Sequence, residues 1–97
     1  MRLLQFRIGR TTVIHLSETA KRIGITRQAH VQQTILAALD RGLPSSVKIR
    51  YLRDAMNNRQ LEQVPLDDDD MVRVEKAAAA EGIPVSRWAL FAVSTVD

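Results

Sequence analysis

The sequence predicts a mainly α-helical protein with a short two-stranded β-ribbon. Three observations lead to this fold class. Residues 3–8 alternate with the period of a half-buried strand, and the two stretches that follow carry apolar residues at helical spacing. The same succession of strand, helix and helix then returns at an offset of 58 residues, so the chain is expected to contain two similar small units.

The strand expected at 3–8 turns its apolar residues to one side. Leu4, Phe6 and Ile8 share a face because successive side chains of a strand point to opposite faces. Gly9 ends the strand. The opposite face is expected to carry Leu3, Gln5 and Arg7.

Two helices are expected to follow this strand. The first runs from about Thr12 to Gly24, where a glycine provides the C-terminal stop, and its apolar positions are Val13, Leu16 and Ala20. Thr26 is expected to cap a second helix that ends at Gly42. The apolar stripe of that second helix is Val31, Ile35, Ala38 and Leu39.

The second half of the chain repeats this pattern of core positions. At the offset of 58, apolar residues fall on apolar residues: Phe6 on Val64, Ile8 on Leu66, Leu16 on Val74, Ala20 on Ala78 and Ile35 on Val93. This predicts a strand near 61–66, a helix near 68–81 and a helix near 85–96. The aspartates at 67–70 are expected to cap the first of these helices and to favour its dipole. Trp88 is expected to be a core residue.

The chain is therefore expected to have three parts. Residues 1–42 form a basic unit, residues 43–60 a linker helix, and residues 61–97 an acidic unit. Residues 1–59 contain eleven Lys and Arg against three Asp and Glu, whereas residues 60–97 contain three against eight. A basic half is typical of a protein that binds a polyanion, and this indicates nucleic acid as the partner.

Several classes of function are not expected. The sequence has no cysteine, and neither histidine has a carboxylate or second histidine at ligand spacing, so we expect no metal, no cofactor and no catalytic residue. An enzyme is therefore not expected. No apolar run is long enough to span a membrane, and the N-terminal segment is too interrupted by charge for a signal peptide, so we expect a cytoplasmic protein without a membrane partner.

The segment Val64-Pro65-Leu66-Asp67, followed by Gly82 and then Val85-Ser86-Arg87-Trp88-Ala89, resembles the ribbon-helix-helix (MetJ/Arc-type) DNA-binding family. The resemblance covers about 37 residues, and residues 1–42 match the same frame less closely, because His30 stands where the family prefers an apolar residue. The resemblance implies tandem ribbon-helix-helix units whose two strands pair into a ribbon. It also implies that this ribbon enters the major groove of double-stranded DNA.

What the resemblance implies for individual residues follows from their position. Side chains on the outer face of the ribbon contact bases, here Leu3, Gln5, Arg7 and Gln63. In the second strand, Pro65 contributes no polar group, and Glu62 is expected to repel phosphate with the nearby aspartates. The N-terminus of the second helix binds phosphate. The phosphate contacts expected are Arg2, Arg10, Thr26, Arg27, Gln28, Lys48 and Arg50.

Alternatives remain open at the level of sequence. Residues 17–29 also resemble a helix-turn-helix, which would place Thr26, Arg27, Gln28 and Gln32 in the groove. The two units are expected to pair within one chain, although pairing between chains of a homo-oligomer is the rival arrangement. We expect a small transcriptional regulator such as a repressor, or a plasmid-maintenance or transfer factor. An antitoxin-like protein that binds a protein partner through its acidic half is the alternative.

Overall fold

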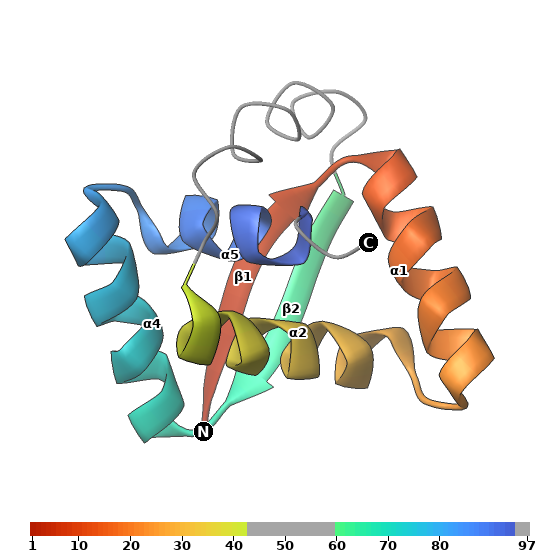
Figure 1. Ribbon diagram of the computed structural model, residues 1–97, viewed down its shortest axis with the longest axis horizontal. Coiled ribbons are helices and arrows are strands. Elements are labelled where there is room, and N and C mark those ends of the chain that lie inside the picture. The colour runs from red at the N-terminus through yellow and green to blue at the C-terminus, as the bar shows by residue number, and fades with distance from the viewer. Residues whose placement is uncertain (43–59, 95–97) are drawn as a thin grey trace.

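The computed structural model describes residues 1–42 and 60–94, and these residues form four helices and a two-stranded antiparallel sheet. The mainly α-helical class with a short two-stranded ribbon, predicted from sequence, is therefore confirmed. The elements follow one another in the order β1 (Arg2–Ile8), α1 (Arg10–Ile23), α2 (Arg27–Arg41), β2 (Gln60–Leu66), α4 (Asp68–Glu81) and α5 (Val85–Ser94) (Figure 1).

The expected element boundaries hold to within one or two residues in the described ranges. Helix α1 begins at Arg10 rather than near Thr12, because Gly9 occupies the N-cap position in an extended conformation and its carbonyl accepts from the Val13 N–H at 3.1 Å. A linker helix was expected at 43–60. Positions 43–59, which include Lys48 and Arg50, lie outside the described residues, and Gln60 belongs to β2.

The helix ends have the residue types that their backbone requires. Gly24 and Gly82 adopt left-handed conformations, with φ of 81° and 71°, which a residue with a side chain reaches only with strain. Thr26 caps α2 as expected, since its hydroxyl accepts from the Ala29 N–H at 3.1 Å. The side chain of Asp67 makes no such bond at the start of α4, so that part of the expectation is wrong. The aspartates at 68–70 still lie in the first turn, where the helix dipole favours negative charge.

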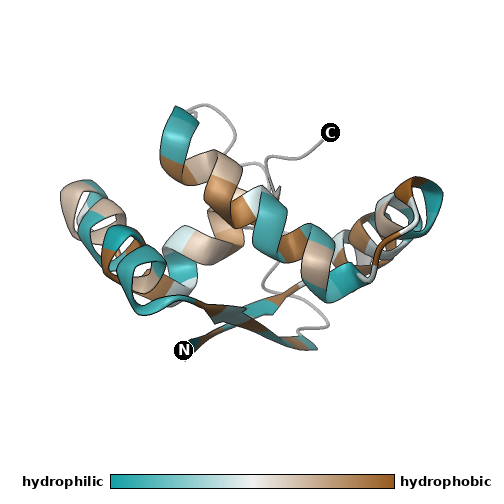
Figure 2. Ribbon diagram, turned by 90° about the horizontal axis from the view of Figure 1, so that it is seen from below, coloured by the Kyte–Doolittle hydropathy of each residue, from teal (hydrophilic) through white to brown (hydrophobic). Residues whose placement is uncertain are grey.

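Strand β1 pairs antiparallel with β2 of the same chain. Gln5 lies opposite Gln63 at the centre of the ribbon, and Leu3 and Arg7 lie opposite Pro65 and Leu61 at its two ends. The described helices all lie on one side of this ribbon, as Figure 2 shows. One face of the ribbon is therefore covered and the other is bare.

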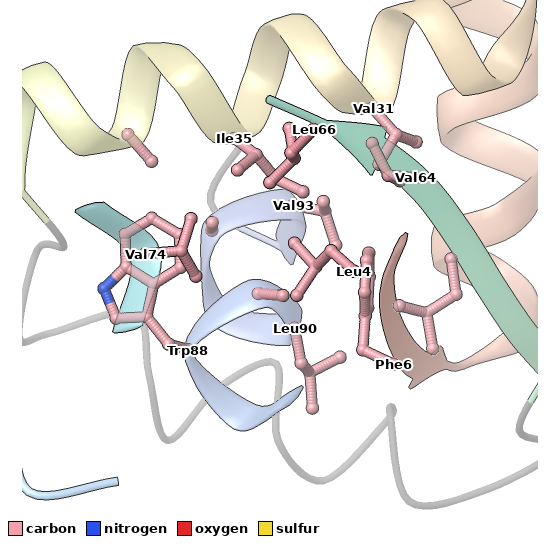
Figure 3. Close-up of a cluster of buried hydrophobic side chains, with 14 of the residues drawn as sticks. Leu4, Phe6, Val31, Ile35, Val64, Leu66, Val74, Trp88, Leu90 and Val93 are labelled. Atoms are coloured by element: carbon pink, nitrogen blue, oxygen red, sulfur yellow. The ribbon is translucent and has the colours of Figure 1, made fainter. Parts of the chain in front are cut away.

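The hydrophobic core lies between the covered face of the ribbon and the helices. Helices α2 and α5 cross over the ribbon, while α1 and α4 flank it on opposite sides (Figure 1). Trp88 is only 2% exposed, so it is a core residue as expected. Figure 3 shows the side chains that converge here from both strands and from α2, α4 and α5: Leu4, Phe6, Val31, Ile35, Val64, Leu66, Val74, Trp88, Leu90 and Val93.

Two isoleucines provide a matched test of this core. Ile35 on α2 is fully buried, whereas Ile14 on α1 is 48% exposed. We expect Ile35→Ala to lower the free energy of unfolding by about 2–5 kcal/mol, because it removes buried methyl groups and leaves a cavity. Ile14→Ala should change it by less than about 0.5 kcal/mol. Urea unfolding of both variants measures this, and equal losses would contradict the packing described.

Candidate nucleic-acid interface

The bare face of the ribbon carries six alternating side chains. Three come from β1 and three from β2, as the strand periodicity predicts. Leu3 and Leu61 are 52% and 45% exposed, although apolar side chains of this size are usually buried. The polar residues of the face are exposed and Pro65 is half-buried. The six residues are Leu3, Gln5, Arg7, Leu61, Gln63 and Pro65. We call them the outer face.

The polar groups of the outer face are available to a partner. The side chains of Gln5, Arg7 and Gln63 make no hydrogen bond or ion pair with any other residue that the structure describes. Arg10, which follows the ribbon at the Arg7 end, is likewise exposed and has no ion pair within the described ranges. These four residues were expected to contact DNA, and the fold leaves all four side chains in solvent.

Helix α2 covers the free edge of β2. The side-chain amide of Gln28 donates to the carbonyl of Gln63 at 3.0 Å, and that of Gln32 donates to the carbonyl of Pro65 at 3.1 Å. Gln28 was expected to contact phosphate, but its amide is engaged within the protein. Strand edges otherwise expose unpaired backbone groups that promote association with other strands, so these two bonds protect the edge.

The same contact explains why a proline is tolerated in β2. The N–H and C=O of a residue in an antiparallel strand point to the same side. Since the carbonyl of Pro65 points to Gln32 of α2, the nitrogen of Pro65 also faces away from β1. Its missing N–H therefore removes no hydrogen bond between the two strands.

Glu62 lies on the inner face of the ribbon, where it is only 4% exposed. It was expected to repel phosphate together with the nearby aspartates, but the fold places its side chain away from the outer face. Its Oε1 lies 3.2 Å from Nε of Arg27 in the first turn of α2, an ion pair without the alignment of a hydrogen bond. Burial raises the pKa of Glu62, and the charge of Arg27 opposes this shift.

The ion pair with Glu62 defines the orientation of Arg27. The guanidinium carries five N–H donors, and the contact with Glu62 uses the Nε side of the group. The side chain of Arg27 remains 42% exposed, so part of it is accessible to solvent beside the N-terminus of α2. Thr26, Arg27 and the free N–H groups of the first turn thus lie together, which is an arrangement that attracts anions.

The opposite end of the ribbon is neutralised by α4. Nη1 of Arg2 lies 3.0 Å from Oε1 of Glu75, and the N-terminal ammonium lies 3.5 Å from Oδ1 of Asp68. Arg2 was expected to contact phosphate, but in the folded chain it is paired with an acidic residue. The two ends of the ribbon therefore differ in charge, with free cations at the Arg7 end and ion pairs at the Arg2 end.

The two histidines are neighbours in the fold, which their spacing in the sequence did not indicate. His30 on α2 is 8% exposed, and burial followed by the charge of His15 on α1 lowers its pKa. Nε2 of each residue is buried without a hydrogen-bond partner. His30 binds a proton more readily in the unfolded chain than in the folded one. Protonation of His30 therefore favours unfolding, and the stability of the fold decreases as the pH falls below 6.5.

Within the described ranges, no group of three or more His, Cys, Asp and Glu side chains is placed to hold a metal ion. None of the helices in these ranges has the length and apolar character needed to cross a membrane. Comparisons with models of known families, with curated proteins and with solved structures return no match.

The alternation of residues predicts the outer face, but it does not identify Glu62 as a partner of Arg27. A signal was present, because Glu62 has the same alternation phase as Val64 and Leu66 and must share their buried face. What the sequence could not reveal was the partner, since Arg27 lies 35 residues away on another element.

The buried carboxylate of Glu62 generates a prediction about stability and pH. Because the folded pKa lies above the unfolded value of 4.5, protonation of Glu62 stabilises the fold. That stabilisation is complete below pH 4.5 and is lost as the pH rises through the folded pKa. Glu62→Gln mimics the protonated form, so it should be more stable than the parent at pH 7. Its advantage should shrink as the pH falls toward 4.5.

Urea unfolding of both proteins across this pH range measures the difference. Glu18→Gln on the exposed surface of α1 is the control and should change stability little. A Glu62→Gln variant that is less stable than the parent at neutral pH would show that the ion pair outweighs the cost of burial.

Proposed function

We propose that this protein binds double-stranded DNA in a sequence-specific manner by inserting its ribbon into the major groove. One observation carries the proposal: the described helices all lie on one side of the ribbon, and the opposite side presents free Gln5, Gln63 and Arg7 side chains. The major groove of B-DNA admits a two-stranded ribbon. We propose that the protein acts as a small regulator, such as a repressor, in transcription or in plasmid maintenance or transfer.

The side chains of the outer face have the chemistry that base recognition needs. A glutamine amide both donates and accepts, so it can bind N6 and N7 of adenine together. An arginine can bind O6 and N7 of guanine in the same bidentate way. Gln5, Gln63 and Arg7 supply these groups, and neither α1 nor α2 has to move to expose them.

The order of elements supports the assignment of two ribbon-helix-helix units. Each half of the described chain contains one strand and two helices, and the two strands form one antiparallel ribbon. We propose that both units lie in a single chain, so that one polypeptide forms the ribbon that two subunits would otherwise form. The pairing of β1 with β2, centred on Gln5 and Gln63, supports this arrangement.

Phosphate contacts are proposed for the end of the ribbon that carries Arg7. Arg27 and the capped N-terminus of α2 lie on this side, because Arg27 contacts Glu62, and Glu62 is next to the Arg7–Leu61 pair. Arg10 begins α1 at the same end. Cations and helix N-termini that flank a groove bind the DNA backbone and fix the orientation of the protein.

The helix-turn-helix alternative is less well supported. It requires the side chains of Gln28 and Gln32 to enter the groove, yet both donate to backbone carbonyls of β2. Breaking these bonds would leave the edge of β2 uncovered. The ribbon needs no such rearrangement, and we therefore favour it.

Arg7 and Arg10 are expected to contribute to DNA binding in different ways. Arg7→Ala should weaken binding by about 1–3 kcal/mol and relax the preference at one base pair, because Arg7 contacts a base edge. Arg10→Ala should weaken binding to all duplexes alike and reduce the slope of affinity against salt by about one, because Arg10 contacts phosphate. Gel-shift titrations of both variants at several salt concentrations, on several duplexes, measure these effects.

The outcomes separate the alternatives. Uniform and equal losses from both variants would contradict base contact by the ribbon and favour the helix-turn-helix arrangement. An affinity of the parent protein that barely changes between low and physiological salt would contradict DNA binding of this kind altogether.

The oligomeric state in solution tests whether the two strands pair within one chain. Because β1 and β2 pair within the chain and share one core, we expect a folded monomer of 10.9 kDa in the absence of DNA. Sedimentation equilibrium at low micromolar concentration measures the mass. A mass near twice that value would show that the chains associate, and would favour pairing between chains.

A further inference from the structure

The ribbon has an approximate two-fold relation between its strands. In the register of β1 and β2, Gln5 and Gln63 are directly opposite, so a two-fold axis through the centre exchanges each residue of β1 with the residue 58 positions later. This axis exchanges Leu3 with Leu61 and Gln5 with Gln63. The outer face therefore presents the same leucine and the same glutamine on both sides of its centre.

The relation fails at one pair of positions. Arg7 is exchanged with Pro65, so a guanidinium on one side of the ribbon corresponds to a ring without a polar group on the other. The outer face is symmetric in four of its six side chains and asymmetric in the remaining two.

The flanks of the ribbon are asymmetric in the same sense. The residue related to Arg10 is Asp68, and the residue related to Arg27 is Val85. At the Arg7 end, Arg10 has no ion pair in the described chain and Arg27 is partly exposed at a capped helix start. At the other end, Asp68 lies 3.5 Å from the N-terminal ammonium.

We propose that the DNA site is a palindrome of adenine and thymine that is broken by a guanine on one side only. This inference rests on the proposed function and specifies the sequence that the outer face selects. Gln5 and Gln63 each bind an adenine, and Leu3 and Leu61 each pack against the methyl group of a thymine. Arg7 binds the guanine, and no side chain repeats that contact at Pro65.

The dimensions of the ribbon agree with a compact site. From Leu3 to Arg7 the strand extends roughly 13 Å at the usual rise per residue. This is the length of about four base steps of B-DNA. The guanine belongs to the half of the site whose flanking phosphates face Arg10 and Arg27, so this half determines the direction in which the protein binds.

Selection of duplexes from a random pool by the full chain tests this inference. The parent protein should enrich a sequence with two related A·T half-sites and one guanine. Replacing that guanine should weaken binding by the parent about tenfold. The same replacement in the duplex should change the affinity of the Arg7→Ala variant less than about twofold, because that variant has already lost the contact with guanine. The A·T half-sites should remain in the sequences that Arg7→Ala selects.

A variant that adds a second arginine to the outer face tests the asymmetry of the DNA site more sharply. Pro65→Arg should add a guanine at the related position of the second half-site and make the selected sequence a full palindrome. Pro65→Ala is the matched control, because it removes the ring without adding a guanidinium and should add no guanine. Circular dichroism and urea unfolding verify that both variants fold.

The possible outcomes distinguish failure of the asymmetric DNA site from failure of DNA binding itself. Guanine in both half-sites of the parent, half-sites without any two-fold relation, or a folded Pro65→Arg variant that selects no new guanine would overturn the inference while leaving DNA binding intact. Failure of the parent to enrich any duplex would overturn the proposed function itself. One guanine for the parent, none for Arg7→Ala and two for Pro65→Arg is the expected result.

Discussion

The antiparallel pairing of β1 with β2 is the interaction on which the rest of the structure depends. A strand and two short helices bury too little apolar surface to be stable alone. Pairing the strands places Leu4, Phe6 and Ile8 beside Val64 and Leu66 on one face, and this shared surface is what α2 and α5 cover. The core therefore belongs to both halves of the chain at once, and neither half has one of its own.

The same pairing creates the proposed binding face. Since strand side chains alternate between faces, burying one face of a two-stranded ribbon forces the intervening residues outward. Leu3 and Leu61 remain exposed for this reason, although solvent disfavours them. On the opposite, inner face of the ribbon, the buried carboxylate of Glu62 is paired with Arg27 at the start of α2.

Local patterns in the sequence sufficed for much of this structure. Alternation in residues 3–8 gave the exposed and buried sets of β1, and Gly24, Thr26 and Gly82 gave the ends of the helices, because each of these features depends only on neighbouring residues. Contacts between distant elements could not be obtained in this way. The bond from Gln28 to β2 spans 35 residues and the pair of Arg2 with Glu75 spans 73, and both removed a residue from the set expected to be free for phosphate.

The proposed function requires that the outer face of the ribbon, and not the α1–α2 pair, contacts base edges. Nuclear magnetic resonance of the complex with a selected duplex tests it most directly, through the leucine methyl groups and the glutamine side-chain amides. The ribbon arrangement predicts intermolecular contacts from Leu3, Leu61, Gln5 and Gln63 to thymine methyl groups and other major-groove protons. It also predicts that the amides of Gln28 and Gln32 remain bonded to β2. Major-groove contacts from Gln28 and Gln32, with the ribbon side chains unperturbed, would contradict it.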